Sequence, residues 1–299
     1  MKPQKQILGH LAAFFTIFVW GLTFISTRVL MVSFTPVEIM FFRLFLAVLA
    51  LCVISPPRFD RLRLDRPALR LELSVVLAGL CGVTLLFLFQ NLALLYTLTA
   101  NVSVLISVTP LFTALVSRLV LGEQLKANFF IGFSAAMLGI ILIAFNGSFV
   151  LKLNPLGDLL SLLAALSWAF YSVVIKKINP PQQAVFALTR KVFFYGLLLM
   201  LPVLPLFHFR LGLARLVVWS DLLNLLFLGV VASALCYVTW NYAVQHLGPV
   251  RTSSYIYAIP VVTIVVSALV LNETITLVAV IGMALILVGM ALSEREKAG

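Results

Sequence analysis

The hydrophobic positions of this chain gather into ten long apolar runs that are separated by short polar stretches. Each run has about 20 residues, the length that a helix needs to cross a bilayer. Lipid offers the backbone no hydrogen-bond partners, so runs of this length predict helices and not strands. The expected helices occupy residues 8–27, 35–54, 73–94, 99–120, 128–146, 156–175, 185–206, 222–243, 250–271 and 275–293. The pattern predicts an all-α integral membrane protein with ten transmembrane helices.

The composition indicates that lipid is the main solvent. Of the 299 residues, 63% are hydrophobic and only 10% are charged, whereas soluble domains have about 25% charged residues. The net charge of +11 could indicate nucleic acid as a partner. The basic residues lie, however, in short loops between the apolar runs, as in the cytoplasmic loops of membrane proteins. We therefore expect a lipid bilayer as partner and no nucleic acid.

The same loops predict how the chain is oriented. The longest polar connection, Ser55 to Arg70, carries five arginines, and such loops stay in the cytoplasm. Counting crossings from this loop places fourteen basic residues on its side of the membrane and four on the other side. We therefore expect a multi-pass protein of the cell membrane, in bacteria the inner membrane, with both termini in the cytoplasm.

An internal repeat relates two parts of the chain. Residues 79–139 match residues 229–289 at a constant offset of 150 positions. Matched pairs include Gly79 with Gly229, Asn91 with Asn241, Ser103 with Ser253, Pro110 with Pro260, Glu123 with Glu273, Gly132 with Gly282 and Gly139 with Gly289. A repeat in an apolar chain is typical of a duplicated transporter whose binding site forms between the copies.

The repeat extends to the earlier helices of each copy. Trp20 pairs with Trp168, and Arg43 pairs with Arg190 after a small change in spacing. We therefore assign helices one to five to a first unit, residues 1–146, and helices six to ten to a second unit, residues 147–299. An odd number of crossings in each unit predicts two inverted five-helix repeats. Two such copies can exchange an inward-open site for an outward-open one.

Several segments are similar to a known family. The run Trp20-Gly21-Leu22-Thr23-Phe24, the spacing from Pro36 to Arg43, and the two matching segments that begin at Pro110 and Pro260 resemble EamA-type members of the drug/metabolite transporter superfamily. The resemblance covers essentially the whole chain. It implies a basket-like carrier of ten helices that exports amino acids or other small metabolites.

Arg43 is the most costly side chain in the predicted helices. An arginine at the centre of a membrane helix costs about 2.5–3.5 kcal/mol on insertion scales, so it needs a partner or water. One interpretation is that Arg43 attracts a substrate carboxylate through two parallel hydrogen bonds. The other is a structural role, in which Arg43 holds carbonyls of a neighbouring helix or Glu38.

The remaining candidate binding residues are aromatic or polar. Aromatic side chains could line a central cavity and suit an apolar or cationic part of a substrate, although helix packing would also explain them. Asparagine amides and hydroxyl groups within the helices need hydrogen-bond partners, which either the other copy or a substrate could provide. The aromatic candidates are Trp20, Phe24, Trp168, Tyr171, Tyr237, Trp240 and Tyr257, and the polar candidates are Asn91, Ser103, Asn241 and Ser253.

Two prolines and four glycines have matched positions in the copies. Pro110 and Pro260 weaken their helices locally, so we expect them to act as hinges. Gly132, Gly139 and their partners make smooth helix faces for close packing, and the same faces could join two chains as a homodimer.

Other functional classes find less support. The chain has no Walker-type phosphate loop, and its cysteines, Cys52, Cys81 and Cys236, form no metal-binding spacing. We expect no cofactor, no metal and no catalytic residues. The predicted function is secondary transport of a small molecule, with a channel or an intramembrane enzyme as the alternatives.

Overall fold

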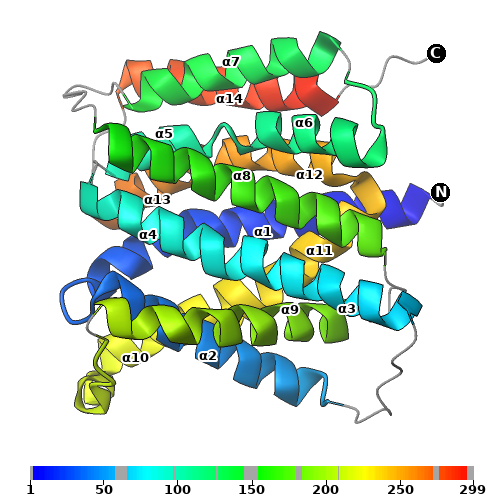
Figure 1. Cartoon of the computed structure of the whole chain (residues 1–299). Helices are drawn as coiled ribbons and strands as arrows, with labels where there is room; N and C mark the ends of the chain where they lie inside the picture. Colours follow the sequence, from blue (N-terminus) through cyan, green and yellow to red (C-terminus); the bar gives the residue numbers. More distant parts are fainter. Residues whose placement is uncertain are drawn as a thin grey trace.

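The computed structural model describes residues 3–57, 66–96, 99–125, 127–144, 154–179, 184–207, 209–271 and 276–294, and within these ranges the regular secondary structure is all helical, with short turns between the helices (Figure 1). The helices of the first half are α1 (Pro3–Leu30), α2 (Pro36–Ile54), α3 (Arg66–Gly79), η1 (Leu80–Leu85), α4 (Leu86–Tyr96), α5 (Thr99–Ile106), α6 (Thr109–Leu121) and α7 (Ala127–Ala144). Those of the second half are α8 (Pro155–Ile178), α9 (Val185–Met200), η3 (Leu201–Phe207), η4 (Leu213–Val217), α10 (Trp219–Leu226), η5 (Phe227–Leu235), α11 (Cys236–Leu247), α12 (Pro249–Ser253), η6 (Ser254–Ala258), α13 (Ile259–Leu271) and α14 (Leu277–Glu294).

These helices combine into the predicted membrane spans. Within the described ranges, nine helical stretches are long and apolar enough to cross a membrane, and Leu277–Ser293 is a shorter apolar helix. Several spans contain more than one element: α3, η1 and α4 form one span, Pro67–Ala93, and α10, η5 and α11 form another, Trp219–Leu247. The prediction of an all-helical, ten-span protein is confirmed.

The third and eighth spans each contain a π-helical segment. η1 ends at Leu85 and η5 ends at Leu235, two positions related by the offset of 150. π-Segments are uncommon in helices and occur often at functional sites. The repeat therefore preserves a backbone irregularity as well as residue identities.

The glycine faces show that the two copies run in opposite directions. A Cβ atom on Gly132 would lie 2.4 Å from the carbonyl oxygen of Gly289, and one on Gly139 would lie 2.4 Å from the carbonyl oxygen of Gly282. Rising residue numbers on α7 thus meet falling numbers on α14, so these equivalent helices are antiparallel (Figure 1). The same contacts show that these faces do not join two chains, because they are used within one chain, and a homodimer stays a prediction.

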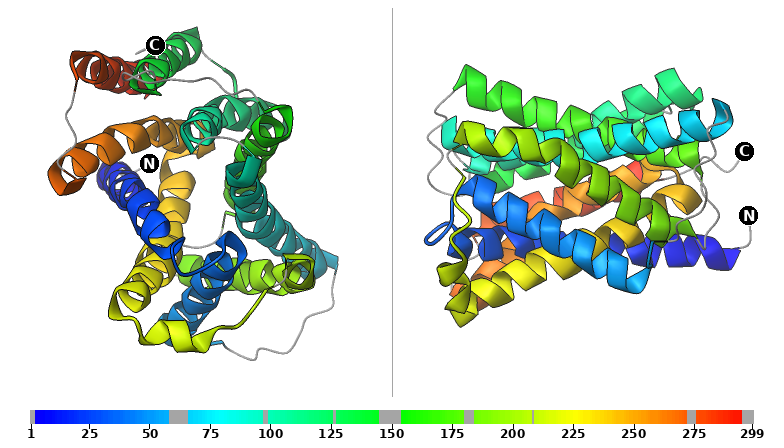
Figure 2. Two further views of the ribbon diagram at one scale, coloured as in Figure 1. Left: turned by 90° about the vertical axis from the view of Figure 1, so that its left-hand side faces the viewer. Right: turned by 60° about the horizontal axis from the view of Figure 1, so that its bottom comes forward.

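Helices of one half pack mainly on helices of the other. Thr16 of α1 hydrogen-bonds Thr239 of α11 at 2.7 Å. The equivalent arrangement places Tyr171 of α8 against Gly82 of η1, where any side chain larger than hydrogen would overlap the tyrosine ring. The α7–α14 pair lies at one side of this arrangement (Figure 2). The interface between the halves therefore runs through the centre of the molecule.

Candidate functional site

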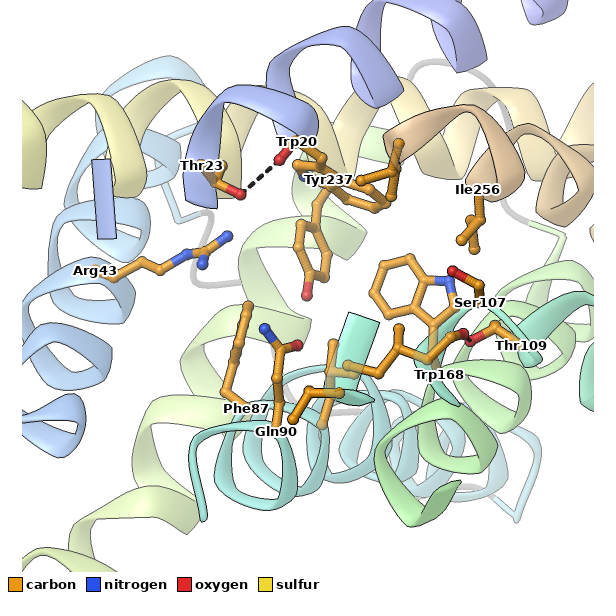
Figure 3. Close-up of a pocket in the computed structure, with 14 residues that line it drawn as sticks. Trp20, Thr23, Arg43, Phe87, Gln90, Ser107, Thr109, Trp168, Tyr237 and Ile256 are labelled. Atoms are coloured by element: carbon orange, nitrogen blue, oxygen red, sulfur yellow. Dashed lines mark hydrogen bonds between the residues drawn. The ribbon is translucent and has the colours of Figure 1, made fainter. Parts of the chain in front are cut away.

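A cavity with about 880 Å³ of empty space, its opening included, lies between the two halves (Figure 3). Its described lining residues are Trp20, Thr23, Arg43, Leu86, Phe87, Gln90, Val102, Ile106, Ser107, Thr109, Trp168, Tyr237, Ile256 and Ile259.

The lining reflects the repeat. Four pairs of equivalent positions face the cavity together: Trp20 and Trp168, Phe87 and Tyr237, Ile106 and Ile256, Thr109 and Ile259. Ten of the fourteen lining residues nevertheless belong to the first half. The cavity is therefore built around the symmetry of the molecule but is shifted towards one copy.

Aromatic rings form one wall of the cavity. Trp20 lies at the centre of this group, with ring centroids 5.2 Å from Trp168 and 6.0 Å from Tyr237. The Trp20 indole nitrogen donates to the Ala232 carbonyl at 2.9 Å, which fixes the ring against η5. The Tyr237 hydroxyl donates to the Gly82 carbonyl of η1 at 2.8 Å. The wall is thus held by hydrogen bonds between the halves, and the π-segments supply both acceptors.

Arg43 reaches the cavity from α2. Its Nε donates to the Ser233 hydroxyl at 2.5 Å, and the centre of its guanidinium lies 4.4 Å from the centroid of the Phe87 ring. Glu38 is not its partner. The Glu38 carboxylate accepts from both terminal nitrogens of Arg215, each at 2.9 Å. This pairing with Glu38 raises the pKa of Arg215 and ties the η4 segment to the start of α2.

Three predicted residues lie beneath the cavity and not on its surface. The Tyr171 hydroxyl donates to Asn241 Oδ1 at 2.6 Å, and Asn241 Nδ2 donates to the Thr189 hydroxyl at 3.0 Å. Trp240 is fully buried, with its ring centroid 5.2 Å from that of Trp20. Tyr171 and Asn241 satisfy each other, and Trp240 packs against Trp20, so the three side chains form a packed floor and not binding surface.

Other predicted residues lie elsewhere. Asn91 donates to the Pro36 carbonyl at 3.2 Å and lines a separate apolar groove between α2, α4 and η3. Ser253 donates to the Val250 carbonyl at 2.8 Å, because a hydroxyl on a helix readily bonds the preceding turn. Tyr257 is buried in the cluster around α7 and α14. The side chains of Phe24 and Ser103 lie outside the described residues.

Both predicted hinge prolines mark breaks in the fourth and ninth spans. In the first half, α5 ends at Ile106 and α6 restarts at Thr109, with Pro110 in its first turn. In the second half, the 3-10 segment η6 separates α12 from α13, and Pro260 is the second residue of α13. Ser107 and Thr109, at the first break, also line the cavity.

Side-chain contacts join helices at the end of the bundle that carries the start of α1 and the end of α14 (Figure 1). There His10 Nδ1 lies 2.6 Å from the Tyr255 hydroxyl, and Lys176 Nζ donates to the Gln245 carbonyl at 2.6 Å. Burial raises the pKa of Glu123 at this end, while the nearby Lys176 charge opposes the rise. The cavity residues Thr23 and Gln90 lie in the halves of their spans remote from this end.

Some lining residues were missed by reasoning from the sequence, although the repeat could have identified two of them. Phe87 is the partner of Tyr237, and Gln90 is the partner of Trp240, both of which the sequence singled out. The hydrophobic residues Val102, Ile106 and Ile256 gave no signal, because apolar side chains in membrane helices are equally expected to face lipid.

The fold and cavity together define a membrane transporter built from two antiparallel copies of one helical unit, with its candidate site between them. The chain belongs to the EamA-like transporter family, whose model matches residues 7–145 and again residues 155–294. It is therefore a multi-pass membrane transporter and not an enzyme.

Similar proteins agree over their whole lengths. An uncharacterized transporter of Archaeoglobus fulgidus is 29% identical over 96% of this chain and 98% of its own length. The uncharacterized inner membrane transporter YedA of Escherichia coli is 26% identical over 98% of this chain and 93% of its own. A probable terminal-alkyne amino-acid exporter of Streptantibioticus cattleyicolor is 25% identical over 100% of this chain and 96% of its own. A crystal structure with 20% identity shares the fold, with a TM-score of 0.72 over 95% of each chain.

Proposed function

We propose that this transporter is a secondary carrier that exports an amino acid or a related small metabolite by alternating access. The observation that carries the proposal is the cavity between two antiparallel copies. At one end of the bundle the two halves are joined by the contact between His10 and Tyr255. In inverted-repeat carriers, one copy rocks against the other and exposes a central site to each face in turn. The amino-acid class and the export direction rest on the name of the Streptantibioticus relative.

The proposed units of movement are residues 1–146 and 147–299. Pro110 and Pro260 are the proposed hinges, since each follows an interruption of helical hydrogen bonding in its span. The arginine-rich loop between Ser55 and Arg70 supports cytoplasmic termini. The end that carries the start of α1 and the end of α14 then faces the cytoplasm, and the cavity is reached from outside the cell.

The test is counterflow of labelled amino acids and related small carboxylates in proteoliposomes. A carrier loaded with unlabelled substrate accumulates the labelled form transiently, whereas a channel only equilibrates it. We expect Trp168→Ala and Arg43→Ala to abolish counterflow while both variants remain folded, because both side chains line the cavity. Parental rates in both variants, or unitary currents through the reconstituted protein, would contradict the proposed site or the carrier mechanism.

A further inference from the structure

The described lining of the cavity carries positive charge and no negative charge. Among its described lining residues Arg43 alone carries a charge, and no carboxylate is present. The acid closest in sequence, Glu38, is held by Arg215 through two hydrogen bonds. Arg43 therefore brings a positive charge into the membrane interior without an acidic partner in the described part of the chain.

The hydrogen-bonding capacity of Arg43 is only partly used. A guanidinium has five N–H donors and keeps its charge in proteins. Its Nε donates to Ser233, and the Phe87 ring lies below its plane. Its terminal nitrogens have no hydrogen-bond partner among the described residues, and Figure 3 shows them directed into the cavity.

A second unused donor lies across the cavity. Trp168 is only 5% exposed, and its indole nitrogen is buried without a hydrogen-bond partner among the described residues. A buried donor that bonds to nothing is costly, by about 1–3 kcal/mol. Both groups are donors, but the indole nitrogen is enclosed by protein, so it is the Arg43 guanidinium, directed into the cavity, that would be completed by an acceptor with negative charge.

The described lining residues of the cavity provide no carboxylate for an ammonium group, so only hydroxyl and amide oxygens and aromatic faces could receive it. The polar lining residues other than Arg43 and the aromatic donors are Thr23, Gln90, Ser107 and Thr109. The Thr23 hydroxyl donates to Trp20 and that of Thr109 donates to Ile106. A zwitterion would place its ammonium without a carboxylate in the same space as the Arg43 charge, where the low polarity strengthens repulsion.

We propose, within the carrier function proposed above, that the substrate is a monovalent organic carboxylate with an aromatic or aliphatic body. Its carboxylate binds Arg43, and its body packs against Trp20, Trp168 and Tyr237. The amine of a related amino acid is absent or acylated in this substrate. A single guanidinium balances a single negative charge, so a phosphate ester or dicarboxylate would retain an unpaired charge in the membrane interior.

Three probes with the same phenyl ring and two-carbon chain test this assignment: 3-phenylpropionate is an anion, phenylalanine a zwitterion and 2-phenylethylamine a cation. Isothermal titration to the purified protein should show 3-phenylpropionate binding at least about tenfold tighter than the other two, the value of one charge-assisted hydrogen-bond pair. Arg43→Gln should remove that preference, and Arg43→Lys should retain most of it.

Arg190→Gln is the matched control. Arg190 is the repeat partner of Arg43, lies outside the cavity and donates to the Ser55 carbonyl. We expect this variant to keep the anion preference. Equal or tighter binding of phenylalanine or 2-phenylethylamine, an anion preference that survives in Arg43→Gln, or no binding of any probe overturns the proposal.

Transport measurements distinguish a failure of this substrate proposal from a failure of the carrier mechanism on which it rests. Counterflow of N-acetylphenylalanine and of phenylalanine is compared in proteoliposomes of the same preparation. Faster counterflow of the acylated anion supports both proposals. Selective anion binding without counterflow supports the substrate class and contradicts the carrier mechanism, whereas counterflow that favours phenylalanine supports the carrier and contradicts the substrate class.

Discussion

The two halves of the molecule descend from the same segment but use equivalent positions differently. Gln90 faces the cavity, whereas its partner Trp240 is fully buried beneath it. Within the described residues, Asn91 makes one hydrogen bond to a backbone carbonyl, whereas its partner Asn241 joins two side chains in a buried network. The first copy thus lines an open space at positions where the second copy fills it.

This difference explains how a symmetric architecture holds an asymmetric site. Two perfectly equivalent halves would place the cavity midway between them, with the same chemistry at both ends. Here the larger side chain Trp240 stands where the first half has an amide, and Arg43 enters the cavity where Arg190 does not. The cavity and its charge therefore come mainly from the first half, and the second half supplies the floor.

We expect the largest effect on transport when a cavity residue of the first half is replaced by the side chain found at the equivalent position of the second half. In Gln90→Trp, an indole occupies the cavity as Trp240 occupies the floor. We expect substrate flux to fall to background while thermal unfolding changes little, because Gln90 is half-buried and has space beside it. Flux in proteoliposomes and a melting curve of the same preparation check this. Parental flux in this variant would show that substrate does not pass Gln90.

The reverse exchange, Trp240→Gln, should damage stability. Trp240 is fully buried against Trp20 and Trp168. Removing a buried tryptophan costs about 3–5 kcal/mol. Unfolding in mixed micelles at increasing denaturant measures the loss. A loss below about 1 kcal/mol, the range of surface changes, would contradict the packed floor.

Asn91 and Asn241 allow the two halves to be compared at equivalent positions that carry the same side chain. Asn241→Leu leaves the buried Tyr171 and Thr189 hydroxyls without the amide, and we expect a loss of about 2–3 kcal/mol. Asn91→Leu removes one half-buried bond to Pro36 and should cost about 1 kcal/mol. Denaturant unfolding of both variants gives the two values. Equal losses of unfolding free energy would mean that Asn241 stabilises the fold no more than Asn91 does.

A smaller effect concerns the end of the bundle that carries Glu123. Burial raises the pKa of Glu123 above its ordinary value, so the folded state favours the protonated carboxyl. Stability from this group is fully present below the ordinary pKa of about 4.5 and declines as pH rises through the raised value. Melting temperatures of Glu123→Gln and the parent should therefore differ slightly more at pH 7 than at pH 4. A difference that shrinks towards neutral pH would contradict this environment.

The sequence was sufficient for the architecture because its signals are strong and redundant. Apolar runs must become helices in lipid, and the offset that pairs Gly139 with Gly289 also relates the antiparallel helices α7 and α14. The glycine faces were not assigned correctly as a possible dimer interface, because a smooth glycine face does not say which helix covers it, and here the covering helix belongs to the same chain.

The cavity was only partly predictable. Trp20, Arg43, Trp168 and Tyr237 stood out as large or charged side chains near the middle of spans, and all four line it. Neighbouring candidates such as Tyr171 and Asn241 are equally prominent in sequence, but helix rotation directs them at each other. The π-segments that set this rotation in the third and eighth spans left no recognisable signal in the residues.

Side-specific labelling of a cavity residue tests most directly whether the chamber opens to one face at a time. Thr23→Cys, in a background where Cys52, Cys81 and Cys236 are replaced by serine, places one thiol in the cavity. An impermeant maleimide should react from a single membrane face without substrate and from the opposite face during counterflow. Equal reaction from both faces at rest, or reaction from the same face under all conditions, would contradict alternating access.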